Sequence, residues 1–349
     1  MGEDIPERHW ASSQTLTVRS AVHESLANIG SGSTIIVACS GGPDSLALAA
    51  AAAFVGKQRE ISVIAVIVDH QLQEASAEVA QAAAAACLEF GIDSVVVAEV
   101  AVNGDGGPEA AARRARYEAL EAMAAKYQAS CILLGHTQDD QAETVLLRLA
   151  RGSGTRSIAA MQFRNGLLVR PLLQVSRAVV HASAKDVCSA IGVVPWSDPH
   201  NLDPRFTRVR VRAAFEGLEE ALGAGFVAGL ARSALLASDD ADALDQWAAQ
   251  EFDSLVTFDD CSMSVGIDDF QLLPSAIRSR MIRRMCMDLG AGSDAVTLGH
   301  VQAVDALITQ WRGQGPVSLP ARVLACREYG RLTLTSPKST LNAGDPLAT

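Results

Sequence analysis

The stretch Ser40-Gly41-Gly42-Pro43-Asp44-Ser45 decides the fold class and gives the first indication of function. It follows the apolar run 34–39 and precedes the Ala- and Leu-rich run 46–55. A strand, a glycine turn and a helix start form an anion site, because the glycines expose backbone N–H groups and the helix N-terminus adds positive partial charge. Asp44 would repel a phosphate unless a cation lies between them. The hexapeptide therefore predicts a phosphate site that uses a divalent metal.

Two common phosphate motifs do not fit this stretch. A Walker loop needs G-x-x-x-x-G-K-[ST], and the nearest approach, Gly56-Lys57-Gln58, lacks the upstream glycine and the hydroxyl. The dinucleotide motif G-x-G-x-x-G cannot be laid on Gly41-Gly42. An ordinary strand-to-helix turn with a serine cap is the remaining alternative, and the complete hexapeptide after the first strong strand favours the phosphate site.

Apolar runs alternate with helical patterns around this stretch. We expect strands at 34–39, 61–68, 93–100 and 131–134, and helices from about 44, at 74–90, at 108–127 and from about 139. Near-continuous apolar strands separated by helices predict an α/β fold, a doubly wound, mainly parallel sheet with helices on both faces.

The rest of the 349-residue chain divides by composition. We expect a helical stretch at 218–255, a basic helix at 270–289, a helix at 298–311, and a hairpin or two short strands within 317–334. The predicted domains are an N-terminal helical extension (1–30), a catalytic domain (31–215), a helical linker (216–256), a small α+β domain (257–335) and a disordered tail (336–349).

Polar clusters follow three of the predicted strands. They are 40–45, Asp69-His70 and 135–144, and in a parallel sheet ligands bind beyond these strand ends. In the third cluster Asp139 and Glu143 are i,i+4 on one helix face, which suits Mg²⁺ or an ammonium group. Asp139 and Asp140 would also serve as helix caps, but His136 and Glu143 in the same ten residues favour a functional site.

Two arginine clusters suggest anion binding. Arg113 and Arg116, beside Tyr117, suit a phosphate or carboxylate, although pairing with Glu109 is an alternative. Arg208, Arg210 and Arg212 alternate, which predicts an extended, positively charged segment suited to a nucleotide or an RNA backbone.

The bulk composition limits the class of protein. The net charge is −11, yet residues 113–212 hold 15 Lys/Arg against 8 Asp/Glu, leaving 14 against 32 elsewhere, which indicates a basic face on an acidic body. None of the seven cysteines forms C-x-x-C, so zinc ribbons and iron–sulfur sites are not expected. With no apolar run of membrane length and no signal peptide, we expect a cytoplasmic protein without a membrane partner.

Taken together, these motifs resemble a known family. The hexapeptide is similar to the loop of the PP-loop N-type ATP pyrophosphatases. Over about 30–215 the chain resembles the tRNA(Ile)-lysidine synthetases, through Val68-Asp69-His70, Glu109…Tyr117, Gly135…Thr144 and Asp198-Pro-His-Asn201…Arg208. The later part is similar to that family's linker and small C-terminal domain, in a short form with one C-terminal module.

The resemblance implies a ligase that uses ATP and Mg²⁺ to join free L-lysine to C2 of the wobble cytidine (position 34) of the isoleucine tRNA with a CAU anticodon. The C2 oxygen attacks the α-phosphorus and pyrophosphate leaves; the lysine ε-amine then expels AMP. Codon reading changes from AUG to AUA. A homodimer is compatible with the resemblance.

The resemblance also implies site residues. ATP would lie against Ser40, Gly41, Gly42, Pro43, Asp44, Ser45, Asp69, His70, Gly135 and His136. Mg²⁺ would lie on Asp44 and Asp139, with Asp139 and Glu143 alternatively receiving the lysine ammonium. The residues implied in catalysis are Asp44, Arg113, His136, Asp139, Glu143 and Arg208, and those implied in RNA binding are Arg116, Arg205, Arg210, Arg212, Arg283 and Arg284.

The chain departs from the family pattern at Val209, where the family often has asparagine, which leaves the role of Arg208 open. Two rival functions stay open as well. One is another PP-loop adenylating enzyme that modifies tRNA, although the thiolating kind would need C-x-x-C. The other is an ATP-regulated RNA-binding protein without catalysis.

Overall fold

The computed structural model describes residues 12–71, 75–101, 108–152, 154–198, 201, 203–292 and 294–337, without the side chains of 108–110. The predicted tail from 338 onward, Glu74, Pro199-His200 and the side chain of Glu109 lie outside this description. The chain divides into two compact units, 1–238 and 239–349, and each is described by itself.

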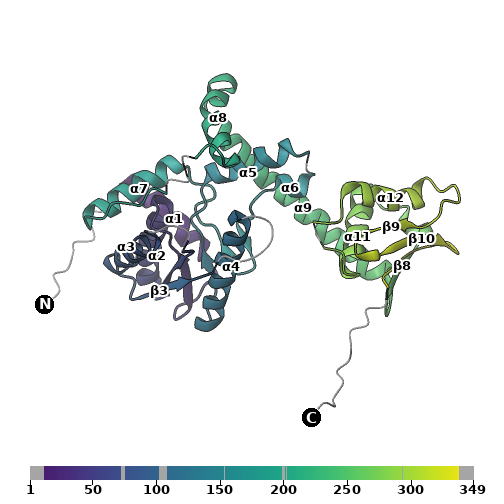
Figure 1. The fold of residues 1–349 in the computed structure, drawn as a ribbon, viewed down its shortest axis with the longest axis horizontal. Coiled ribbons are helices and arrows are strands. Elements are labelled where there is room, and N and C mark those ends of the chain that lie inside the picture. The colour runs from purple at the N-terminus through teal and green to yellow at the C-terminus, as the bar shows by residue number, and fades with distance from the viewer. Residues whose placement is uncertain are drawn as a thin grey trace, which may run out of the picture. The chain divides into compact units, whose positions relative to one another are not determined.

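The N-terminal unit is built on a six-stranded sheet (Figure 1). Its order is β3 (Ser94–Glu99), β2 (Ser62–Asp69), β1 (Thr34–Ala38), β4 (Ile132–Leu133), β6 (Leu168–Val169) and β5 (Arg164–Asn165). All neighbours are parallel except β5 and β6. The predicted parallel α/β sheet is confirmed, whereas β5 and β6 were not expected.

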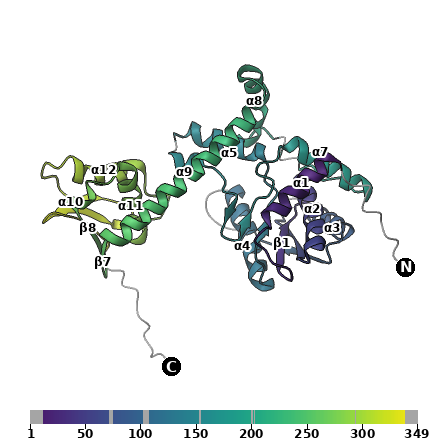
Figure 2. The same cartoon turned by 180° about the vertical axis from the view of Figure 1, so that it is seen from behind.

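Alternate residues of β1 serve the two faces of the sheet, as a strand requires. Ile35 and Val37 join a core with helices α1 (Ser13–Ser25), α2 (Pro43–Arg59), α3 (Ser76–Glu89) and α7 (Arg177–Ala190). Ile36 and Ala38 pack on the opposite face, against α4 (Pro108–Tyr127) through Leu120. Helices therefore cover both faces, as Figures 1 and 2 show.

The strand order determines which residues lie at the crevice of the sheet. From β1 the chain winds outward to β2 and β3, then returns to add β4 on the other side of β1. Helices leaving neighbouring strands on opposite sides open a crevice at the carboxyl ends of β1 and β4. Residues 39–45 and 134–138 occupy that point.

The segment with alternating arginines is helical, so the expected extended segment is wrong. Residues Thr207–Leu222 form α8, which packs against α5 (Gln138–Ala150). Each arginine has its own environment in the helix: Arg210 donates to the carbonyl oxygens of Pro204 and Arg205 before the helix, and Arg212 donates to Glu143 of α5. The two-residue alternation therefore does not reflect a strand.

The expected helical stretch 218–255 is two helices, α8 and α9 (Phe226–Leu255). They are separated at Gly223 and Gly225, whose φ angles of 97° and 99° suit glycine and end α8. Among the described residues no single helix has the length and apolar character of a membrane span, and α8 with α9 meets that test only as a bent pair.

The C-terminal unit has a five-stranded antiparallel sheet, β7-β8-β11-β10-β9. β10 and β11 form the predicted hairpin, while β7 and β8 were not expected. Helix α11 begins after Pro274 rather than near 270, because a separate short helix, α10, precedes it. The elements are β7 (Thr257–Asp259), β8 (Ser262–Gly266), α10 (Ile267–Phe270), α11 (Ser275–Asp288), α12 (Leu298–Thr309), β9 (Val317–Ser318), the 3₁₀ turn Pro320–Arg322, β10 (Leu324–Glu328) and β11 (Arg331–Thr335).

Candidate active site

The hexapeptide forms the turn between β1 and α2. Gly41 has a φ of 79°, a conformation that favours glycine, and an added Cβ would lie 3.3 Å from Ala83 Cβ of α3. The Ser45 hydroxyl braces the turn from inside: it accepts from the Ser40 N–H at 3.1 Å and donates to the Gly42 carbonyl oxygen at 3.0 Å. Trp196 N–H donates to the Gly41 carbonyl oxygen at 2.9 Å. The loop is therefore held in one shape before any ligand binds.

The end of β4 lies directly against this loop. A Cβ on Gly135 would sit 3.2 Å from the Asp44 carbonyl oxygen and 3.4 Å from Ser45 Cα. The absent side chain at Gly135 lets the two strand ends meet, as predicted from the cluster positions.

Three buried polar atoms at successive strand ends have no hydrogen-bond partner in the described part of the chain. They are Asp44 Oδ1 after β1, His70 Nδ1 after β2 and His136 Nδ1 after β4. His181 Nε2 of α7 lies 3.2 Å from Asp44 Oδ1, but outside hydrogen-bond geometry. Buried polar atoms are normally paired, so this group indicates a polar ligand in the crevice.

Both histidines are held neutral. Burial is the main cause that lowers the pKa of His136, which falls to about 3. The charge of Asp140 raises this pKa, whereas the charges of Arg116, Arg170 and Arg113 lower it further. Burial and Arg116 likewise lower the pKa of His70, against Asp69. The charge of Arg116 thus lowers the pKa of both histidines, while Arg113 is exposed and donates to the Tyr117 hydroxyl at 3.2 Å.

An acidic cluster surrounds Arg177, at the start of α7. Its guanidinium contacts Asp140 Oδ1 at 2.8 Å and Glu143 Oε1 at 3.1 Å, and its backbone N–H donates to Asp139 Oδ2 at 2.7 Å. Burial alone would lower the pKa of Arg177, but Asp140, Glu143, Asp139 and Asp44 together raise it. The predicted pair Asp139 and Glu143 thus shares one cation with Asp140 and Asp44.

The capping alternative holds for part of this cluster. Thr137 and Asp140 form a capping box at the start of α5. Burial would raise the pKa of Asp140, but Arg177 and the Thr137 N–H lower it. Glu143 is fully buried and accepts from both Arg177 and Arg212, the latter at 2.8 Å. Asp139 keeps one carboxylate oxygen without a partner among the described residues.

Sequence reasoning missed Arg177, His181 and Arg170. Arg170 is buried and donates to the Gln162 carbonyl oxygen at 2.7 Å, while its Nε has no partner in the described chain. Both arginines follow β6, a two-residue strand parallel to β4. The rule that ligands lie beyond parallel strand ends would have found them, had so short a strand been predicted.

Most of the arginines predicted to bind RNA have partners within the protein. Arg205 pairs with Asp203, and Arg210 donates to backbone carbonyls. In the C-terminal unit Arg283 donates to the Val296 carbonyl oxygen, and Arg284 stacks over Phe252. Arg208 lies about one turn before Arg212 on α8.

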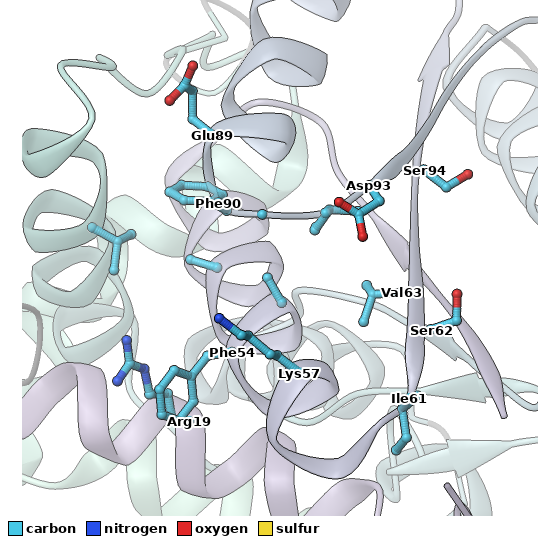
Figure 3. A pocket seen from close by; sticks show the side chains of 15 residues that line it. Arg19, Phe54, Lys57, Ile61, Ser62, Val63, Glu89, Phe90, Asp93 and Ser94 are labelled. Carbon is cyan, nitrogen blue, oxygen red and sulfur yellow. The ribbon is translucent and has the colours of Figure 1, made fainter. Parts of the chain in front are cut away.

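A separate cavity of about 570 Å³ lies at the amino-terminal ends of the strands, beside the first residues of β2 and β3 (Figure 3). Lys57, Phe54 and Phe90 line it together with Asp93. Parallel α/β sheets bind ligands beyond the carboxyl ends of their strands, and the buried atoms without hydrogen-bond partners lie at those ends. The crevice is therefore the candidate active site.

The residues at the crevice fit a magnesium ion in part. Asp44 offers a buried carboxylate oxygen beside the anion loop, with no hydrogen-bond partner among the described residues and with His181 Nε2 at 3.2 Å. No cluster of three or more metal-ligating side chains exists among the residues that the structure describes. Mg²⁺ commonly uses one or two carboxylates together with substrate phosphates, so a full protein cage is not required.

Comparison with known proteins identifies the family of the chain. A family model described as a PP-loop domain matches residues 15–216, and one described as a TilS substrate binding domain matches 266–333. The tRNA(Ile)-lysidine synthase of Thermobifida fusca is 50% identical over 320 residues, covering 91% of this chain and 97% of that protein. The chain belongs to the tRNA(Ile)-lysidine synthase family. The Streptomyces coelicolor member of the family is 46% identical over 304 residues, 86% of this chain and 84% of that protein.

A solved structure supports the fold of this lysidine synthase family member. The U34-tRNA thiolase NcsA from Methanococcus maripaludis, with its [4Fe-4S] cluster, matches with a TM-score of 0.52 at 17% identity. The match covers 63% of this chain and 77% of the thiolase. At this identity the likeness establishes the fold alone.

Proposed function

We propose that this protein joins L-lysine to C2 of the wobble cytidine of the CAU-anticodon isoleucine tRNA, with ATP cleaved to AMP and pyrophosphate. The observation that carries the proposal is the group of unpartnered buried atoms on Asp44, His70 and His136, at the ends of three strands. Family membership supports the same activity. The homodimer and the cytoplasmic location stay predictions.

The first step adenylates the cytidine. The C2 oxygen forms a bond to the α-phosphorus, and the bond to pyrophosphate breaks. Backbone N–H groups of residues 40–45 stabilise the leaving pyrophosphate, and Arg116 supplies positive charge at the crevice. His136 is neutral at pH 7, so it serves as a hydrogen-bonding group toward the nucleotide rather than as a cation. Mg²⁺, held by Asp44 and phosphate oxygens, would neutralise phosphate charge.

The second step brings in lysine. The ε-amine nitrogen of lysine attacks C2, the C–O bond to AMP breaks, and the nitrogen gives its proton to the Asp139 carboxylate. Around Arg177, four carboxylates (Asp44, Asp139, Asp140 and Glu143) outnumber the two guanidinium groups of Arg177 and Arg212, which gives this part of the crevice a local negative charge. This charge attracts a cationic substrate. Asp139 receives the lysine ammonium through its unpartnered oxygen, whereas Glu143 positions Arg177 and Arg212.

Mass spectrometry of the anticodon nucleoside tests the proposal. The protein is incubated with ATP, Mg²⁺, lysine and the CAU isoleucine tRNA, and lysidine is expected together with AMP. Asp44→Asn, which keeps the shape and removes the charge, should lower the rate by about 100-fold or more, as expected for loss of a group that orders the phosphates. Unmodified cytidine with wild-type protein that binds ATP and tRNA would support the non-catalytic RNA-binding function instead.

A further inference from the structure

Helices α5 and α8 bring three arginines together beside the acidic cluster. Glu143 of α5 contacts Arg212 of α8 at 2.8 Å. Arg148 lies five residues further along α5, and Arg208 lies four residues back along α8. Helix α8 packs against α5, and the charge of Arg208 lowers the pKa of Arg148 in the C-terminal half of α5. Arg151 is i+3 from Arg148 and lies on the same side of the chain.

In the described part of the chain, no carboxylate forms an ion pair with these three guanidinium groups. Arg148 is held in place because its Nη1 donates to the carbonyl oxygens of Ser157 at 2.6 Å and Ala160 at 3.0 Å. Burial lowers the pKa of Arg148, and the charges of Arg208 and Arg151 lower it further. Like charges held this closely repel one another unless an anion lies among them. The cluster therefore favours an anionic partner.

The position of the cluster indicates which kind of anion binds there. Five residues at about 1.5 Å and 100° each place Arg148 roughly 7.5 Å along α5 from Glu143 and about 140° around the helix. The loop at 40–45 already provides a site for the ATP phosphates. An RNA chain that enters the crevice with one nucleotide carries further backbone phosphates on either side of it, and the guanidinium fork matches phosphate oxygens.

We propose that Arg148, Arg151 and Arg208 bind a backbone phosphate of the tRNA next to the nucleotide that is modified. This inference rests on the proposed function, since it takes tRNA as the substrate. It gives Arg208 a role in holding RNA, one of the two roles that its place in the sequence left open.

Binding of the tRNA to the full chain, without ATP or lysine, tests the inference. Arg151→Gln, Arg208→Gln and the double variant are compared with Arg232→Gln, which removes an exposed arginine on α9 of the same unit. Arg148 is left intact because it braces residues 157–160. We expect the double variant to bind tRNA about tenfold more weakly, the loss for a charge-assisted hydrogen bond.

The salt dependence gives a readout that a folding defect would not produce. Loss of one phosphate contact in a single-stranded segment should reduce the slope of log K against log salt by about 0.7. Arg232→Gln should keep the wild-type affinity and slope. Arg151→Gln should raise the KM for tRNA more than it lowers kcat.

Two results would overturn the inference. One is a double variant with the affinity and salt slope of Arg232→Gln. The other is Arg151→Gln with a lowered kcat and unchanged tRNA affinity, because that variant would act on chemistry. Failure of the proposed function is a separate outcome: wild-type protein would form no lysidine, whatever its tRNA affinity.

Discussion

Gly135→Ala is the sharpest test of how the strand ends build the site. The new Cβ would lie 3.2 Å from the Asp44 carbonyl oxygen, 3.3 Å from its carbonyl carbon and 3.4 Å from Ser45 Cα. These neighbours are backbone atoms, so the loop or the end of β4 must move by a few tenths of an ångström. Overpacking of this kind costs about 1–3 kcal/mol. Since a shift of about 1 Å can cost 100-fold in rate, a smaller shift should lower kcat/KM for ATP roughly tenfold.

The assay pairs AMP formation with thermal unfolding. Gly30→Ala is the control, because its Cβ would meet nothing within 4 Å and its φ is not positive. We expect the control to change stability by less than about 0.5 kcal/mol and to keep full activity. If Gly135→Ala matched Gly30→Ala in both measurements, the contact between β4 and the loop would not position the phosphates.

Two further predictions concern charge. Arg177→Gln removes the cation shared by Asp140 and Glu143, and urea unfolding at pH 7 should show a loss of about 2–4 kcal/mol, a little under a fully buried pair. Because the folded pKa of Asp140 is lowered, this stabilisation is present above the unfolded carboxyl pKa and is lost as the pH falls through the folded value; an equal effect at pH 3 and pH 7 would contradict it. His136→Asn removes a histidine whose folded pKa is about 3, so its neutral form stabilises the fold above pH 6.5 and loses this contribution as the pH falls. Between pH 6.5 and 5 the wild type should lose up to about 2 kcal/mol more than the variant, and parallel stability curves would refute the assignment.

Local pattern predicted much of the fold and part of the site. The apolar runs that became β1, β2 and β3 are continuous because both faces of the sheet are covered. The clusters at 40–45 and 135–144 could be placed together, since parallel strands end at one edge. Gly135 and Asp44 are in fact in contact distance of one another.

The missed features depend on packing between distant segments. β6 has two residues, too few for a periodic signal, and Arg170 and Arg177 follow it. The segment 207–212 looked extended because its arginines alternate, yet its conformation is set by packing of α8 on α5 and by the pair of Arg212 with Glu143. Such partners are 69 residues apart, so no local pattern records them.

The fate of the α-phosphate of ATP tests the central claim most directly. The protein is incubated with the CAU isoleucine tRNA and ATP labelled at the α-phosphate, first without lysine. The account predicts label bound to the tRNA, and its release as AMP when lysine is added. Label found as ADP, or a tRNA that stays unlabelled while AMP forms, would contradict adenylation of the cytidine at the crevice between β1 and β4.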